Sequence, residues 1–188
     1  MTAAPPPASL ATDRLVLRRW HDADRAPFAA INADPEVMAT LPAPLTRAES
    51  DGFVDRIEAC FHQRGHGLWV LTRVDDPACL GYVGLWPADA GPALDGAVEV
   101  GWRLAAPAWG RGFATEAARA AVADGFERLG LDEIVSFTWE GNRRSRSVME
   151  KLGMVRDPEG DFDHPRLAGH RLEHHVLYRL ARPADPGR

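Results

Sequence analysis

Six segments of the chain have the residue pattern of strands. The clearest is Gly96–Leu104, which alternates strictly: Val98, Val100, Trp102 and Leu104 face one way, and Glu99, Gly101 and Arg103 face the other. The remaining strands are predicted at Arg14–Trp20, at Glu133–Asn142, at His174–Leu180, and twice within Gly67–Pro87, around an Asp-Asp-Pro turn.

Helical periodicity falls between these strands. One helix is predicted over Asp22–Val37, with Pro35 near its end, and another over Thr46–Gly65, where Thr46 and Glu49 have capping-box spacing. A third follows with an apolar face: Ala114, Ala117, Ala118, Ala121, Val122, Phe126 and Leu129. A short helix begins after Asn142 as N-cap and stops at Gly153. Interleaved helices and strands predict an α/β or α+β layered domain.

Composition narrows the class of protein. The chain has 188 residues, 45% hydrophobic and 26% charged, which fits one soluble globular domain. Its net charge of −5 disfavours nucleic acid and anionic membranes as partners, and no apolar run is long enough for a membrane span. The start lacks the apolar core of a signal peptide, and Cys60 and Cys79 match no metal or redox spacing. We therefore expect a cytoplasmic location.

Small residues cluster immediately before the third helix, in "APAWGRGFATEAARAAV" from Ala106 to Val122. Backbone N–H groups at a helix start lack internal partners, and the helix dipole favours an anion there. The stretch is not a P-loop, because Phe113-Ala114 replaces Lys-Ser/Thr, and its glycine spacing fits a dinucleotide fingerprint poorly. From the loop alone, a tight turn without a ligand remains an equal alternative.

Three arginines crowd the first turn of the last predicted helix: Arg143, Arg144 and Arg146. Cations are unfavourable at a helix N-terminus, by roughly 0.3–1 kcal/mol each when exposed. Three cations at one helix N-terminus therefore suggest that an anion such as phosphate binds there. The alternative is that the arginine side chains simply extend into water.

The stretches "VGWRLAAPAWGRGFATEA" and "FTWEGNRRSRSVMEKLGM", in this order, resemble the GNAT superfamily of acetyl-CoA-dependent N-acetyltransferases. The resemblance runs from about Leu10 to Leu180 and is greatest to the branch of ribosomal-protein N-terminal acetyltransferases. Trp109 stands where the superfamily usually has Gln or Arg. The resemblance implies one domain over residues 10–181, with a central mixed, mostly antiparallel twisted sheet flanked by helices. Residues 1–9 and 182–188 would then be flexible tails.

The resemblance also implies acetyl-CoA as the cofactor and assigns residues to it. Trp109 and the amides of Gly110, Arg111, Gly112, Phe113, Ala114 and Thr115 would hold the pyrophosphate. The backbone of Trp102, Arg103 and Leu104 would pair with the pantetheine arm, and Asn142, Ser145 and Arg146 would lie along the rest. No metal is expected, because His174 and His175 would point to opposite faces of a strand and no HExxH set exists.

Acetyl transfer to an amine needs a base for the amine, a donor for the oxyanion and a donor for the leaving thiolate. Ser145 is the predicted donor, by resemblance to the family's sulfur-contacting serine; otherwise it is an ordinary first-turn residue. Glu99 is one candidate base, acting through water, unless it forms a salt bridge with Arg103. His164 is the other, with Asp161 or Asp163 to orient it.

The predicted function is therefore transfer of acetyl from acetyl-CoA to a primary amine, either a protein N-terminus or a small amine, by direct attack on the thioester. The alternative is a CoA-binding sensor or scaffold without catalysis. Trp86 and Trp102 are candidates for an acceptor pocket, whereas Trp69 and Trp139 are expected in the core. The segments Pro27–Phe61 and Arg156–Arg171 are expected to shape that pocket, and a homodimer is compatible with the resemblance.

Overall fold

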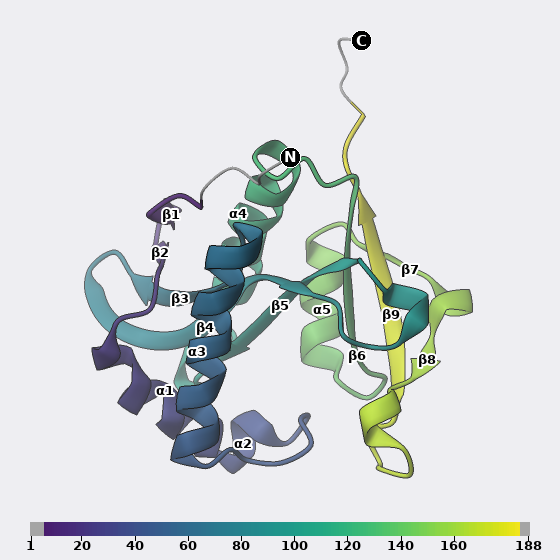
Figure 1. Cartoon of the computed structure of the whole chain (residues 1–188), viewed down its shortest axis with the longest axis horizontal. Coiled ribbons are helices and arrows are strands. Elements are labelled where there is room, and N and C mark those ends of the chain that lie inside the picture. Colours follow the sequence, from purple (N-terminus) through teal and green to yellow (C-terminus); the bar gives the residue numbers. More distant parts are fainter. Residues whose placement is uncertain (1–5, 185–188) are drawn as a thin grey trace.

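Strand pairing builds one continuous sheet in the part of the chain that the structure describes, residues 6–184 of this computed structural model. The strands follow the order β1-β2-β3-β4-β5-β6-β9-β7, with β8 paired to β9 (Figure 1). Their bounds are Ser9–Ala11, Leu15–Arg18, Leu68–Arg73, Asp76–Pro87, Val98–Leu104, Glu133–Trp139, Val155–Arg156, Phe162–Asp163 and His174–Ala181 for β1 to β9. Every pair is antiparallel except β5 with β6. The predicted single domain with a mixed, mostly antiparallel sheet is confirmed.

Helices cover both faces of this sheet. Helices α1 (Asp22–Ala33), α2 (Pro35–Met38) and α3 (Arg47–Arg64) lie on one side, and α4 (Phe113–Glu127) and α5 (Arg143–Lys151) on the other (Figure 1). Four 3-10 turns, Pro92–Leu94, Ala106–Ala108, Pro158–Gly160 and Pro165–Leu167, complete the described elements. Between the layers lies a core of fully buried apolar side chains, including Leu15, Leu17, Phe28, Ile57, Leu71 and Ile134.

Local sequence signals account for most element boundaries. Thr46 forms the predicted capping box with Glu49, and Gly65 ends α3 in a left-handed conformation. The predicted helix over Asp22–Val37 is divided into α1 and α2, because Asp34 is extended and Pro35 opens a new helix behind it. The turn between β3 and β4 falls at Val74 and Asp75, one residue earlier than the Asp-Asp-Pro pattern predicts.

The predicted tails overlap the described residues only in part. Residues 1–5 and 185–188 lie outside the described part of the chain. The added strand β1 begins at Ser9 and pairs with β2, so the sheet starts inside the segment that the sequence assigns to the first tail.

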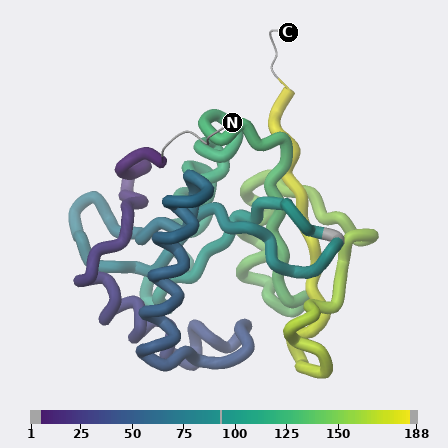
Figure 2. The backbone as a smooth tube through the Cα atoms, in the orientation of Figure 1, coloured from purple at the N-terminus to yellow at the C-terminus, as the bar shows by residue number. Residues whose placement is uncertain are grey.

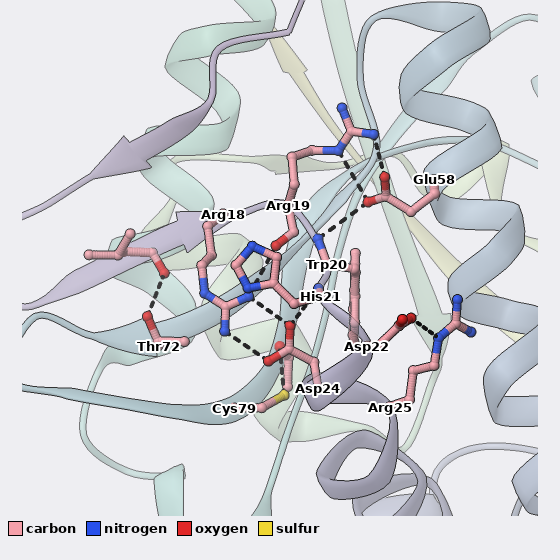
Figure 3. A network of polar contacts seen from close by, with 12 residues as sticks. Arg18, Arg19, Trp20, His21, Asp22, Asp24, Arg25, Glu58, Thr72 and Cys79 are labelled. Atoms are coloured by element: carbon pink, nitrogen blue, oxygen red, sulfur yellow. Dashed lines mark hydrogen bonds and ion pairs between the residues drawn. The ribbon is translucent and has the colours of Figure 1, made fainter.

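Ion pairs fix α1 and α3 to the end of β2 (Figure 3). Arg18 donates to both carboxylate oxygens of Asp24, at 2.7 and 2.8 Å, and Arg19 pairs with Glu58 of α3. Burial raises the pKa of the Asp24 carboxyl, but hydrogen bonds from Arg18 and the His21 amide outweigh it and hold that pKa below its usual value. The network keeps these two helices at a fixed position over one half of the sheet.

The sheet opens between β5 and β6. These parallel strands share one register pair, Glu99 with Val135, and the Ser136 hydroxyl donates to the Val100 carbonyl at 2.9 Å. Beyond that point β5 pairs with β4 alone, while β6 continues beside the C-terminal strand β9 (Figure 2). Two halves of the sheet therefore diverge, and the free edge of β5 from Gly101 onward faces the opening.

Candidate functional site

A cleft of about 1240 Å³ lies where β5 and β6 diverge. Its walls come from β5, β6, the loop before α4, the start of α5, Phe53 of α3, the segment after α2, and the turn around His164. Most sequence-predicted site residues line it: Glu99, Trp102, Arg103, Leu104, Trp109, Gly110, Gly112, Phe113, Ala114, Thr115, Asn142, Ser145 and His164. Arg111 and Arg146 do not. Residues far apart in the sequence thus converge on one cavity.

The glycine loop presents a row of backbone donors to the cleft. Gly112 is the N-cap of α4, and the N–H groups from Gly110 to Thr115 donate to no acceptor in the described part of the chain. Gly110 and Gly112 have φ angles of +73° and +79°, a conformation that favours glycine. A Cβ at Gly110 would meet nothing within 4 Å. The loop therefore needs glycine for its backbone conformation, and its open amides fit an anion.

Asn142 organises the start of α5. Its Oδ1 accepts the Ser145 N–H at 3.2 Å, which confirms the predicted N-cap. Its Nδ2 donates to Thr138 Oγ1 at 2.9 Å and to Ser145 Oγ at 3.1 Å. Because Ser145 Oγ accepts this bond, its own proton remains available to a group in the cleft.

The arginines at this helix start separate into two sets. Arg143 and Arg144 line the cleft, and the Arg144 guanidinium stacks 4.2 Å from the centre of the Trp109 ring. Arg146 turns away and donates to Tyr178 Oη and the Glu140 carbonyl, both at 3.2 Å. Two positions along a helix differ by about 200° in direction, which separates Arg146 from Arg144. The structure thus directs Arg144 toward the cleft and Arg146 away from it.

Glu99 is the carboxylate at the point where the strands part. Burial raises its pKa to about 8, although nearby Arg166 opposes the effect. The alternative salt bridge with Arg103 is absent: among described residues, Arg103 donates instead to Asn32 Oδ1 at 2.7 Å. A carboxylate that titrates near neutral pH has the affinity for protons that a general base needs.

His164 also lines the cleft, but its hydrogen bond makes it a donor. Its Nδ1 accepts the Arg166 N–H at 3.3 Å, so the neutral ring carries its proton on Nε2. Burial, with His175 and Arg166 nearby, lowers its pKa. Neither predicted carboxylate orients it, because Asp161 pairs with Arg156 and Asp163 contacts His174 at 3.0 Å. The geometry therefore favours Glu99 over His164 as the base.

Several lining residues were not assigned to the site from sequence, notably Tyr82 and His175. Tyr82 and His175 are buried, and they line the cleft from strands β4 and β9. Alternation along His174–Leu180 signalled that one of the two adjacent histidines points inward, but not that the cleft lies there.

The tryptophans divide almost as predicted. Trp86 and Trp102 line the cleft, and Trp69 packs in the core. Trp139, which the sequence assigns to the core, is instead partly exposed at the end of β6 and lies outside the lining.

Two further properties of residues 6–184 bear on function. In this part of the chain, no three His, Cys, Asp or Glu side chains gather in a way that could hold a metal ion. None of its helices combines the length and apolar character needed to cross a membrane.

Comparisons with known proteins identify the family and the fold. Residues 14–155 match the family model described as an acetyltransferase (GNAT) domain. The uncharacterized protein YkkB of Bacillus subtilis is 30% identical over 148 residues, which cover 77% of this chain and 84% of YkkB. The FsC-acetyl coenzyme A-N(2)-transacetylase of Aspergillus fumigatus is 30% identical over 66% of this chain and 55% of its own length. An acetyltransferase structure from Agrobacterium tumefaciens superposes with a TM-score of 0.77 at 29% identity, over 93% of this chain and 94% of the other.

Proposed function

Because this chain belongs to the GNAT family of acetyltransferases, which transfer acetyl from acetyl-CoA, we propose that its acceptor is a primary amine and that the transfer occurs in the cleft between β5 and β6. The observation that carries the proposal is the pairing, across one cavity, of a row of open amides with a carboxylate whose pKa is about 8. The first fits the anionic cofactor and the second fits an amine that must lose a proton.

The residues present fit acetyl-CoA. The unpartnered amides from Gly110 to Thr115 would take the pyrophosphate, and Arg143 and Arg144 would meet its remaining phosphate. The edge of β5 that β6 leaves free would pair with the pantetheine arm, although the Leu104 carbonyl already accepts the Trp109 indole N–H at 2.9 Å. When bound, acetyl-CoA supplies the acetyl group as a thioester.

Two side chains of this chain would move protons. Glu99 would take the proton of the acceptor amine, directly or through water. Ser145, whose oxygen already accepts a bond from Asn142, would donate to the sulfur as negative charge builds on it. Since Asn142 caps the helix through the Ser145 backbone N–H, the hydroxyl is not needed to hold the helix start.

Two classes of acceptor amine fit the chemistry of the cleft. The relative from Aspergillus fumigatus is named as an N(2)-transacetylase, which supports an amine. The resemblance to ribosomal-protein N-terminal acetyltransferases favours a protein N-terminus, and a small amine is the other class. Neither Cys60 nor Cys79 forms a disulfide, which fits the reducing conditions of a cytoplasmic enzyme.

Release of the CoA thiol tests the proposal against a non-catalytic CoA-binding module. Wild-type protein with acetyl-CoA is assayed against primary amines and against alcohols with the same carbon skeletons. We expect thiol release matched by N-acetylated product with amines only. Saturable acetyl-CoA binding without thiol release for every amine would instead support a sensor or scaffold.

Ser145→Ala tests the donor in the same assay. We expect kcat to fall by about 10²-fold, the low end for general acid catalysis because thiols leave readily, with CoA affinity retained. Ser147→Ala, on the same helix and also lining the cleft, is the matched control and should stay close to wild type. A change in kcat below about threefold for Ser145→Ala would remove the hydroxyl from the mechanism.

A further inference from the structure

The Arg103 guanidinium lines the cleft without a negatively charged partner. Its Nη1 donates to Asn32 Oδ1 at 2.7 Å, and its Nε is buried with no hydrogen-bond partner. Glu36 and Glu99 are the carboxylates among the lining residues, and neither forms an ion pair with Arg103 in the described part of the chain. A half-buried cation is costly unless a negatively charged group balances it.

Neutral groups hold Arg103 in its position. Asn32 is fully buried, and its amide donates to Ser50 Oγ at 2.9 Å, so the oxygen that receives Arg103 is itself fixed. The guanidinium also lies 5.5 Å from the Tyr82 ring centre and 5.9 Å from that of Phe53. Asn32 and Phe53 belong to α1 and α3, which the ion pairs at the end of β2 fix over the sheet (Figure 3). These neutral contacts orient the Arg103 guanidinium but provide no negative charge to balance it.

Arg103 and Glu99 occupy the two ends of one compartment. They lie four residues apart on the same face of β5, so their Cα atoms are about 13 Å apart. Between them is Gly101, where a Cβ would meet nothing within 4 Å. The paired strand β4 places Trp86 beside Glu99 and Tyr82 beside Arg103.

Aromatic rings form the wall between those two ends. Phe53 contacts Tyr82 at 5.8 Å and Trp86 at 6.1 Å between ring centres, both edge to face. The compartment therefore offers a proton acceptor at one end, an apolar wall along its length and a guanidinium at the other end.

We propose that the acceptor is a small amine that also carries a carboxylate, an amino-acid-like compound, and that the Arg103 side chain holds this carboxylate while the amine lies toward Glu99. Because Nη1 donates to Asn32 and Nε is buried, Nη2 is the guanidinium nitrogen left to donate to a carboxylate in the cleft. This assignment rests on the proposed amine acetylation and names its substrate class.

The other cations of the cleft are placed for different roles. Arg166 pairs with Asp89 at 2.8 Å, which leaves its charge compensated. Arg143, Arg144 and Lys151 belong to α5, across the opening from β5. Arg103 is therefore the cation best placed to receive a carboxylate beside the aromatic wall.

Matched acceptors test the role of Arg103. The value of kcat/KM is measured for free amino acids and for their carboxamides, which keep the amine and side chain but lose the negative charge. Wild-type protein should prefer the carboxylates by about ten- to a hundredfold, the worth of one charge-assisted hydrogen-bonded contact. Arg103→Met should bring this ratio close to one. Calorimetry of CoA binding confirms that the variant is folded.

Arg56→Met is the control, because Arg56 stacks on the same Phe53 ring at 5.5 Å but is exposed and does not line the cleft. It should leave the ratio unchanged. Equal wild-type rates with both members of each pair, or an unchanged ratio in Arg103→Met, would overturn the proposal. Preference for an amidated peptide with an acidic residue over a free amino acid would overturn the small-molecule class. Failure to acetylate any amine would instead refute the amine transferase itself.

Discussion

Glu99 shows how position in the sheet sets the chemistry of one residue. Alternation along Gly96–Leu104 predicted which face of the strand it occupies, and left a solvated or salt-bridged side chain as an alternative. The structure places it at the last paired position before β5 and β6 part, where burial raises its pKa to about 8. The raised pKa of Glu99 could not be predicted from the sequence, because it depends on how closely other segments surround the carboxyl group.

This pKa makes stability depend on pH. Since the folded-state pKa exceeds the ordinary value of 4.5, the folded protein binds more protons at this site between those two values, and its stability falls as pH rises through them. Glu99→Gln removes the titration. We therefore expect its free energy of unfolding, relative to wild type, to rise by on the order of 2–4 kcal/mol between about pH 5 and pH 9.

Urea unfolding at the two pH values measures this difference in free energy. Comparing the same two proteins at both pH values cancels the contributions of the other titrating groups, because wild type and variant share them. A difference that stays constant with pH would mean that the Glu99 carboxyl ionises normally in the folded protein.

At the scale of elements, the glycine loop and the start of α5 are the two segments that we propose to bind acetyl-CoA. Both were predicted from sequence, because their signals are local: glycines before a helix, an Asn N-cap and arginines in a first turn. The direction of each arginine was not predicted. It depends on the rotation of α5 against β9, where Tyr178 receives Arg146 and leaves Arg144 to the cleft.

Gly110→Val tests the loop. A side chain at a φ of +73° strains the turn and covers the open amides, so we expect CoA affinity to fall by about tenfold or more in calorimetry. Gly96→Val is the matched control, because Gly96 has a φ of +81° and equally open surroundings but does not line the cleft. Similar CoA affinities in the two variants would refute the assignment of the loop to the pyrophosphate.

Combined Arg143→Ala and Arg144→Ala substitutions test the start of α5. We expect CoA binding to weaken by about tenfold and dephospho-CoA binding to weaken less, because one of these cations would meet the ribose phosphate. Arg146→Ala should leave both affinities near wild type, since Arg146 is held by Tyr178 and the Glu140 carbonyl. Equal losses for both ligands in the double variant would remove the phosphate contact.

At the scale of the whole molecule, the site exists because two halves of the sheet diverge. Six of the nine described strands were predicted from the residue pattern, whereas the short strands β1, β7 and β8 were not. The spatial order of the strands came from the family resemblance. The part of the cleft that we propose to bind the acceptor was predicted least well, because its contacts join segments that are distant in the sequence. For example, Arg103 of β5 donates a hydrogen bond to Asn32 of α1. Such pairings carry no local signal in a single sequence.

The most direct test of the account is the pH dependence of kcat/KM for acetyl transfer to one amine, in wild type and in Glu99→Gln. Using the same amine makes its own titration common to both profiles. We predict that wild-type kcat/KM rises with pH, with a half-point near pH 8. In Glu99→Gln this rise should be absent, and kcat/KM should be about 10²–10⁴-fold lower than in wild type. A Glu99→Gln protein with the wild-type profile and rate would contradict the central claim that Glu99 takes the proton of the amine.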